Sequence, residues 1–155
     1  MRRLVVFLSA LCALLVTVGT VAAARDHFRA HATGDQEAPK VVTLAQGQAT
    51  FKLTADGTGL EYKLNVANLE DVRFAHIHLA PVGKNGPVVA FLRADRVNGP
   101  VNGRYAEGTL TAASLIGPLA GQPVRALLVA MEAGNTYINV HTDAHPAGEV
   151  RGQIK

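Results

Sequence analysis

The sequence predicts an all-β fold, an antiparallel Greek-key β-sandwich or barrel with one short helix. Short apolar segments follow one another at regular spacing, and turns rich in glycine and proline separate them. Apolar and polar side chains also alternate cleanly over residues 60–66. Because successive strand side chains point to opposite faces, this alternation indicates a strand with one buried and one solvated face, as in antiparallel sheets.

Each element is predicted from a local pattern, in chain order. The predicted strands are residues 41–44, 49–54, 60–66, 74–79, 88–92, 105–110, 137–141 and 147–154. Asp56 and Gly57 predict a hairpin turn between the second and third strands, because this pair readily adopts the positive φ of such turns. The glycines and prolines of residues 80–87 predict a loop. Residues 119–133 predict the helix, since their apolar side chains recur at helical spacing and Gly134 follows them.

Residues 1–24 have the pattern of a secretory signal peptide. Arg2 and Arg3 precede a long apolar stretch, and the alanines at positions 22–24 suit cleavage. Cleavage would leave residues 25–155 as one β-sandwich domain, with no further apolar stretch for a membrane span. The only cysteine, Cys12, lies in the signal peptide, so the mature chain could form no disulfide. We therefore expect a secreted or periplasmic protein.

The mature chain is almost neutral. Without Arg2 and Arg3, 13 of the 15 basic residues remain against 12 acidic residues, which gives a net charge of +1. The sequence has no cluster of lysines and arginines, and it has no tryptophan. These features argue against a nucleic-acid partner.

Two neighbouring histidines are the most informative feature for function. His76 and His78 share one face of the predicted strand 74–79, whose other face carries Ala75 and Ile77. Two imidazoles on one strand face lie close enough to share one ligand.

A second pair, His141 and His145, lies near the C-terminus and completes a candidate metal site. We interpret His76, His78 and His141 as ligands of one metal ion, and His145 as a fourth ligand if a turn through residues 142–144 folds it back. Copper is the leading candidate and zinc the second, because neutral imidazoles suit both ions and affinity peaks at copper. The alternative is that the histidines only donate hydrogen bonds to loop carbonyls.

A separate metal motif would form at the N-terminus if the signal peptide is cleaved after Ala24. The mature chain would then begin Arg25-Asp26-His27. A free amine, two backbone amides and a third-position imidazole form a square-planar set that favours Cu(II) or Ni(II). Cleavage after Ala23 would move His27 to position four and weaken this motif.

The acidic residues near the C-terminus predict supporting roles. Glu149 and Arg151 should share a strand face as an ion pair, which contributes little to stability if it is exposed. Asp143 is placed to orient His141 or His145, as metal-bound histidines commonly require. The sequence shows no nucleophile and base in a catalytic order and no phosphate-binding glycine loop, so it favours a non-enzymatic protein.

Three groups of motifs resemble the CHRD domain, the repeat of chordin that also occurs as a lone secreted domain in bacteria. They are Gly34-Asp35-Gln36-Glu37 with Pro39, Ala75-His76-Ile77-His78 with Asn85-Gly86-Pro87-Val88-Val89, and Tyr137-Ile138-Asn139-Val140-His141-Thr142 with Gly148-Glu149-Val150-Arg151-Gly152-Gln153. The resemblance covers nearly all of the mature chain. It implies a secreted β-sandwich with protein ligands, and the family carries no settled biochemical activity. One departure, His145-Pro146-Ala147 in place of a more usual Asn-Pro-Gly, adds a histidine.

A fainter resemblance is to the copper/zinc superoxide dismutases, which are Greek-key sandwiches with a His-x-His on the copper strand and another histidine on a late strand. His76, His78 and His141 would correspond to these residues. The sequence has no histidine between His78 and His141, so the bridging histidine and the zinc ligands of those enzymes have no counterpart. This absence excludes a paired metal centre.

Three functions remain, in order of preference. The first is a secreted, non-enzymatic CHRD-domain protein with a mononuclear copper site. The second is a metal-free extracellular module that recognises a protein or a cell-envelope partner through surface loops. The third is a superoxide dismutase-like enzyme with a single copper ion.

Overall fold

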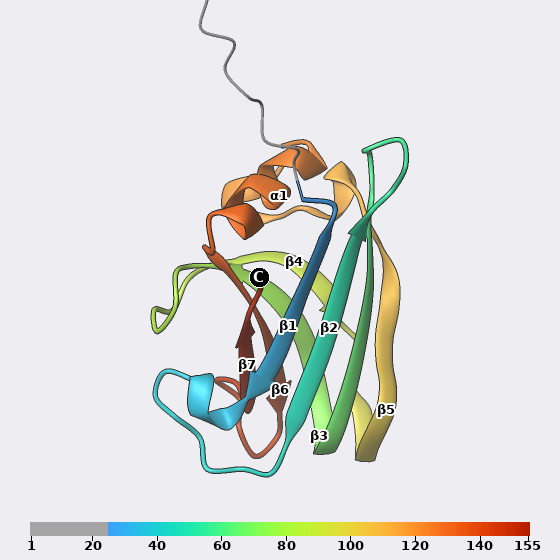
Figure 1. Cartoon of the computed structure of the whole chain (residues 1–155). Helices are drawn as coiled ribbons and strands as arrows, with labels where there is room; N and C mark the ends of the chain where they lie inside the picture. The colour runs from blue at the N-terminus through green and yellow to red at the C-terminus, as the bar shows by residue number, and fades with distance from the viewer. Residues whose placement is uncertain (1–24) are drawn as a thin grey trace, which may run out of the picture.

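The computed structural model describes residues 25–155, which form an antiparallel sheet closed into a barrel (Figure 1). The predicted signal peptide lies outside the described residues. The strands are β1 (His27–Thr33), β2 (Gln46–Leu53), β3 (Leu60–Leu79), β4 (Val88–Arg93), β5 (Val97–Leu110), β6 (Thr136–Thr142) and β7 (Val150–Gln153). One α-helix, α1 (Val124–Glu132), and three short 3-10 turns complete the described elements. The predicted all-β class with one short helix is confirmed.

The long strand β3 organises the barrel. Its first half, residues 60–67, pairs with β2, and its second half, residues 72–79, pairs with β6. The remaining neighbours close the ring in the order β2, β1, β7, β6, while β5 and β4 pair with the first and second halves of β3. Asn68 and Asp71 have positive φ angles of 57° and 49°, where the register against β5 shifts. Such irregularities bend a strand, which lets the two halves of β3 serve different neighbours.

The core fills the inside of the barrel with aliphatic and aromatic side chains from every strand. Leu64, Ile77 and Ile138 are fully buried there. Helix α1 lies across one end of the barrel and buries its apolar face (Figure 1). That face consists of Val124, Leu127, Leu128 and Met131.

The helix is shorter than the predicted residues 119–133. Leu119 belongs to a 3-10 turn, and Pro123 occupies the N-cap position of α1. Proline has no N–H to donate and suits the start of a helix, so the apolar periodicity before it does not extend the helix. Gly134, with a φ of 68°, ends the helix as predicted, because its N–H bonds back to the Met131 carbonyl.

The predicted strand 41–44 is wrong. These residues form a loop in which Val42 and Leu44 are 102% and 83% exposed. A β-branched run alone does not make a strand when it has no neighbour to pair with. The structure adds strand β1, whose alternating buried residues are Phe28 and two alanines, and it joins the predicted strands 60–66 and 74–79 into the single strand β3.

Among residues 25–155, α1 and the 3-10 turns offer no apolar segment long enough for a membrane-spanning helix.

Candidate metal centre

Strands β3 and β6 bring His76, His78 and His141 together on the outside of the barrel. The register pairs Phe74 with His141, so His141 lies diagonally across from His76. The opposite face of β3 carries Ala75 and other buried core residues, as the period of two predicts. One ligand atom from each histidine lies within 4.8 Å of the other two.

The cluster is slightly wider than a filled metal site. Two nitrogens bonded to one ion at about 2.0 Å lie about 3.3 Å apart in tetrahedral geometry and about 4 Å apart when they are opposite each other. The separation of up to 4.8 Å therefore requires the rings to move inward by about 1 Å or less. Small side-chain rotations provide such a movement without a change in the strands.

Loop carbonyls fix the orientation of two of the rings. His78 Nδ1 lies 2.8 Å from the carbonyl oxygen of Gly86, and His141 Nδ1 lies 3.0 Å from that of Pro146. Because a carbonyl only accepts, both Nδ1 atoms must carry the proton, which leaves a lone pair on Nε2. Such carbonyl partners are typical of metal-binding histidines. Gly86 must be glycine here, since a Cβ at this position would clash with the carbonyl oxygen of Leu79.

Each ring retains a buried nitrogen without a partner among the described residues. These atoms are Nε2 of His78, Nε2 of His141 and Nδ1 of His76. The hydrogen bonds to loop carbonyls that the alternative interpretation predicted do exist for His78 and His141, but they use only one nitrogen of each ring. A buried polar atom with no partner is costly, and a metal ion would satisfy it.

The three imidazoles are neutral at physiological pH. Burial, together with the smaller effects of the nearby rings of His141 and His78, lowers the pKa of His76 from 6.5 to about 3. Burial also lowers the pKa of His78 and of His141, although their carbonyl partners oppose this shift. Neutral imidazole is the form that binds metals, so the cluster needs no deprotonation to act as a ligand set.

Aromatic rings surround the cluster. The Phe74 ring lies 4.7 Å from the rings of both His76 and His141, and Phe91 meets His76 edge-on at 4.5 Å between ring centres. Phe91 is 43% exposed, so it forms the boundary between the cluster and solvent. An apolar shell of this kind limits water access and tunes the chemistry of a bound metal.

Two stacked side chains, Tyr137 and Arg151, support the His78 ring. The Tyr137 ring lies parallel to the His78 ring, at 4.7 Å between centres and an angle of 6°. The Arg151 guanidinium covers the other face of Tyr137 at 3.4 Å from the ring centre. Arg151 also donates hydrogen bonds to Asn85 Oδ1 and to the Lys84 carbonyl. It therefore fixes the loop that supplies the carbonyl partner of His78.

The expected ion pair between Glu149 and Arg151 is wrong. Both side chains are buried, with exposures of 8% and 1%, and no salt bridge joins them in the described part of the chain. Glu149 instead accepts hydrogen bonds from Thr43 and Thr142. The charge of Arg151 acts on Glu37, where it opposes the rise in pKa that burial causes. Spacing along the sequence did not reveal these partners, because Thr43 and Glu37 come from segments more than 100 residues away and Thr142 lies at the end of β6.

The remaining candidate residues lie apart from the cluster. His145 is half-buried, and its backbone N–H bonds to Thr142 Oγ1, but its ring is not among the three that meet. His27 is exposed at the start of β1, and the cleavage on which its motif depends falls outside the described residues. Asp143 pairs with Arg73 and Arg96 rather than orienting a histidine.

Buried His76 should make the metal-free protein less stable as the pH falls. The unfolded chain takes up a proton near pH 6.5, while folded His76 stays neutral down to about pH 3, so stability decreases across this window. Glu37 acts in the opposite direction, because burial raises its pKa from 4.5 to about 7 and the folded state takes up its proton first. The two effects partly cancel in the wild type.

The His76→Leu variant isolates the histidine effect. Leucine cannot take up a proton, so we expect the variant to gain about 2 kcal/mol of unfolding free energy relative to wild type between pH 8 and pH 5. Urea denaturation at both pH values measures this change. Glu37→Gln is the matched control and should shift in the opposite direction. An unchanged difference between wild type and His76→Leu would contradict a neutral, buried His76.

Comparison with known proteins gives one match. A family model described as the CHRD domain matches residues 28–154. No curated protein and no solved structure matches the chain.

Proposed function

Because this chain belongs to the CHRD family, which at the family level is a secreted binding or structural module, we propose that it is secreted and binds one metal ion through His76, His78 and His141. The observation that carries this proposal is the convergence of three neutral imidazoles with buried, unpartnered nitrogens. Copper is the proposed ion.

The ligand set supports copper over other metals. Three imidazoles with no thiolate suit copper and zinc, and first-row affinity peaks at copper. The three histidines form the one group of possible metal ligands found in residues 25–155, which supports a mononuclear site. Three protein ligands would leave a coordination position for a further ligand. Zinc remains the second candidate.

The function proposed for the site is binding rather than catalysis. A single-copper dismutase, the third candidate, would need turnover with an open position and a path for an anionic substrate. Near the cluster Asp143 pairs with both Arg73 and Arg96, and its negative charge weakens the field with which these arginines could steer an anion. A metal-free module remains the second candidate. The hydrogen bonds from His78 and His141 to loop carbonyls support it, because they give these histidines a structural role without a metal.

A titration tests the proposal. Metal-free protein should bind Cu(II) at one ion per chain, with electron paramagnetic resonance showing nitrogen coupling from imidazole ligands. The titration uses a His27→Ala background, which removes the N-terminal motif. His141→Ala should lose this binding, and His145→Ala should retain it. Equal binding by His141→Ala and its parent would exclude this cluster as the site and favour the metal-free module.

A further inference from the structure

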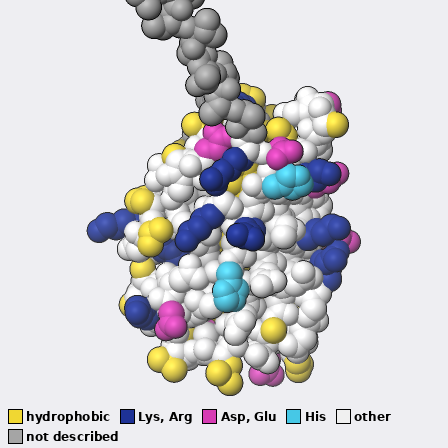
Figure 2. Space-filling view, viewed as in Figure 1, with side chains coloured by type: hydrophobic (Ala, Val, Ile, Leu, Met, Phe, Trp, Pro, Cys, Tyr) yellow, Lys and Arg dark blue, Asp and Glu magenta, His cyan; other side chains and the backbone are white. Residues whose placement is uncertain are grey.

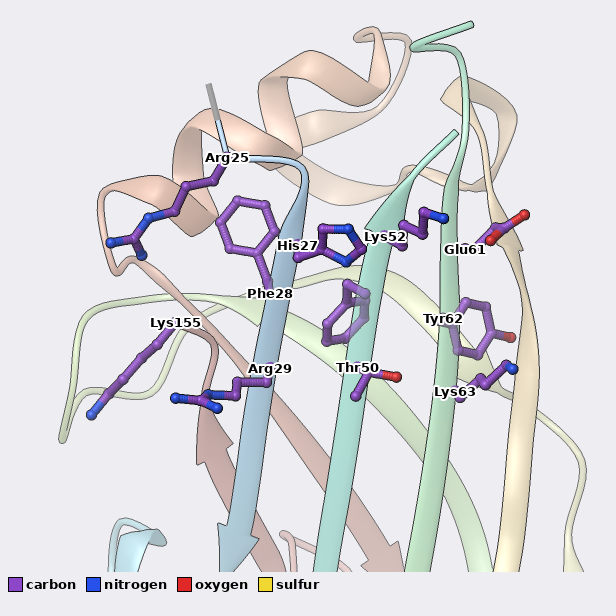
Figure 3. A pocket seen from close by; sticks show the side chains of 11 residues that line it. Arg25, His27, Phe28, Arg29, Thr50, Lys52, Glu61, Tyr62, Lys63 and Lys155 are labelled. Carbon is purple, nitrogen blue, oxygen red and sulfur yellow. The ribbon is translucent and has the colours of Figure 1, made fainter. Parts of the chain in front are cut away.

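Basic side chains gather on the outer face of β1, β2 and the first half of β3, outside the histidine cluster. Figure 2 shows lysines and arginines on this side of the molecule. Figure 3 shows their side chains lining a shallow hollow over the strands. We call this surface the basic face, and it consists of Arg25, Arg29, Lys52, Lys63 and Lys155.

The strand register arranges three of these charges in a row. Arg29 and Lys155 exchange two backbone hydrogen bonds of 2.9 Å, so they lie side by side. Arg29 pairs with Thr50, and Thr50 pairs with Lys63 on the next strand. Neighbouring strands are about 4.8 Å apart, so the row from Lys155 to Lys63 spans about 14 Å. Lys52 stands two residues along β2 from Thr50, on the same face.

The cations of the basic face form no salt bridges among the described residues, although the strand register places Glu61 opposite Lys52 and Glu107 opposite Lys63. Glu61 is the only acidic residue that lines the hollow. The whole mature chain has a net charge of about +1, so this surface concentrates positive charge that the rest of the chain balances elsewhere.

We propose that the basic face binds an acidic polysaccharide, a sugar polymer with repeated sulfate or carboxylate groups. A row of cations across a flat sheet matches an extended chain with regularly spaced anions, whereas a small anion would need a closed pocket. The Thr50 hydroxyl in the middle of the row can hydrogen-bond to sugar hydroxyls.

Other polyanions fit this surface less well. A membrane surface would favour large apolar side chains beside the cations, but the exposed large apolar residues all lie outside the hollow. Single-stranded nucleic acids need aromatic platforms for stacking, and the Tyr62 ring is half-buried with its hydroxyl bonded to the Leu92 carbonyl. The exposed apolar residues are Val42, Leu44, Val82, Phe91 and Val129.

The basic face and the metal cluster are separate surfaces. The cluster uses the second half of β3 with β6, while the basic face uses the first half with β1 and β2. Polysaccharide binding should therefore be the same with and without copper. A test of polysaccharide binding can therefore fail or succeed independently of the proposed metal function.

Calorimetry with the intact protein tests the proposal. Heparin supplies sulfate groups, alginate supplies carboxylate groups, and dextran is the neutral control. We expect binding to heparin, alginate or both, which identifies the preferred anion, and none to dextran. Affinity should fall steeply with added salt, because each contact releases counterions. Failure of both acidic polymers to bind, or tighter binding to single-stranded DNA or to anionic phosphatidylserine vesicles, would overturn the proposal.

Matched variants connect the binding to the basic face. Arg29→Glu with Lys63→Glu should weaken binding at least about tenfold, because two attractive charges in the row become repulsive. Lys40→Glu with Arg125→Glu makes the same change in net charge at exposed positions outside the hollow, and it should change affinity less than about twofold. Equal losses in the two variants would refute the assignment. Melting temperatures, and the milder Arg29→Gln with Lys63→Gln, verify that folding is retained.

Discussion

Saturating copper is expected to raise the melting temperature of the metal-free protein by roughly 10 °C. A ligand at a thousand times its dissociation constant adds about 4 kcal/mol to the unfolding free energy. In a domain of this size each kcal/mol corresponds to about 3 °C. The physical source is the coordination of three buried nitrogens that otherwise have no partner. Differential scanning calorimetry with and without copper measures the shift.

Two alanine variants assign this shift to the cluster. His141→Ala should abolish the shift, because only two of the three imidazoles remain to bind the ion. His145→Ala is the matched control, since it removes a nearby histidine whose ring lies outside the cluster, and it should retain the full shift. The prediction fails if copper stabilises His141→Ala as much as wild type.

Replacing Arg151 by methionine is expected to lower the unfolding free energy by about 3 kcal/mol. Methionine preserves much of the volume but removes the donors to Asn85 and to the Lys84 carbonyl, together with the cation above the Tyr137 ring. The fully buried Arg151 side chain is then replaced by one without donors, and breaking a buried hydrogen-bond network is among the costliest effects of a point mutation. Urea denaturation measures the difference.

The same variant should weaken copper binding by about tenfold, since changes around metal-binding histidines typically cost this much. Arg151 holds the loop whose Gly86 carbonyl orients His78, and it supports the Tyr137 ring on which His78 stacks. Arg125→Met, at an exposed position of α1, should change stability by less than about 0.5 kcal/mol and leave copper binding unchanged. An unchanged copper affinity in Arg151→Met would show that the stacking of Arg151 on Tyr137 does not contribute to copper binding.

The histidine pair on β3 was predictable because its geometry is local. A strand period of two places His76 and His78 on one face whatever their neighbours are, and the structure has both on the outside of the barrel. The CHRD motifs were equally readable, and the family match confirms them. Bringing His141 to the same place depended on the register between β3 and β6, which has no local signal in the sequence.

The surroundings of the cluster were less predictable. Asp143 stands two residues after His141, which suggested that it orients a histidine, but two arginines from other segments bind it instead. Arg151 was predicted to pair with Glu149, yet it is buried and donates to the loop of residues 80–87 instead. Long side chains choose partners by proximity in space, so their pairing follows the arrangement of loops rather than spacing in sequence.

The basic face was also not predictable from the sequence. Its residues are scattered from Arg25 to Lys155, and the sequence has no cluster of basic residues. Pairing of β1 with β2, and of the chain end with Arg29, assembles them on one surface.

The sequence by itself determined the all-β class, the family and the face of β3 that carries His76 and His78, because hydrophobic alternation and motif order are properties of neighbouring residues. The tertiary structure decided that His141 joins them while His145 does not, and that Arg151 is buried. The physical reason is that strand register and loop packing are set by the whole barrel core, in which each contact joins residues far apart in the chain.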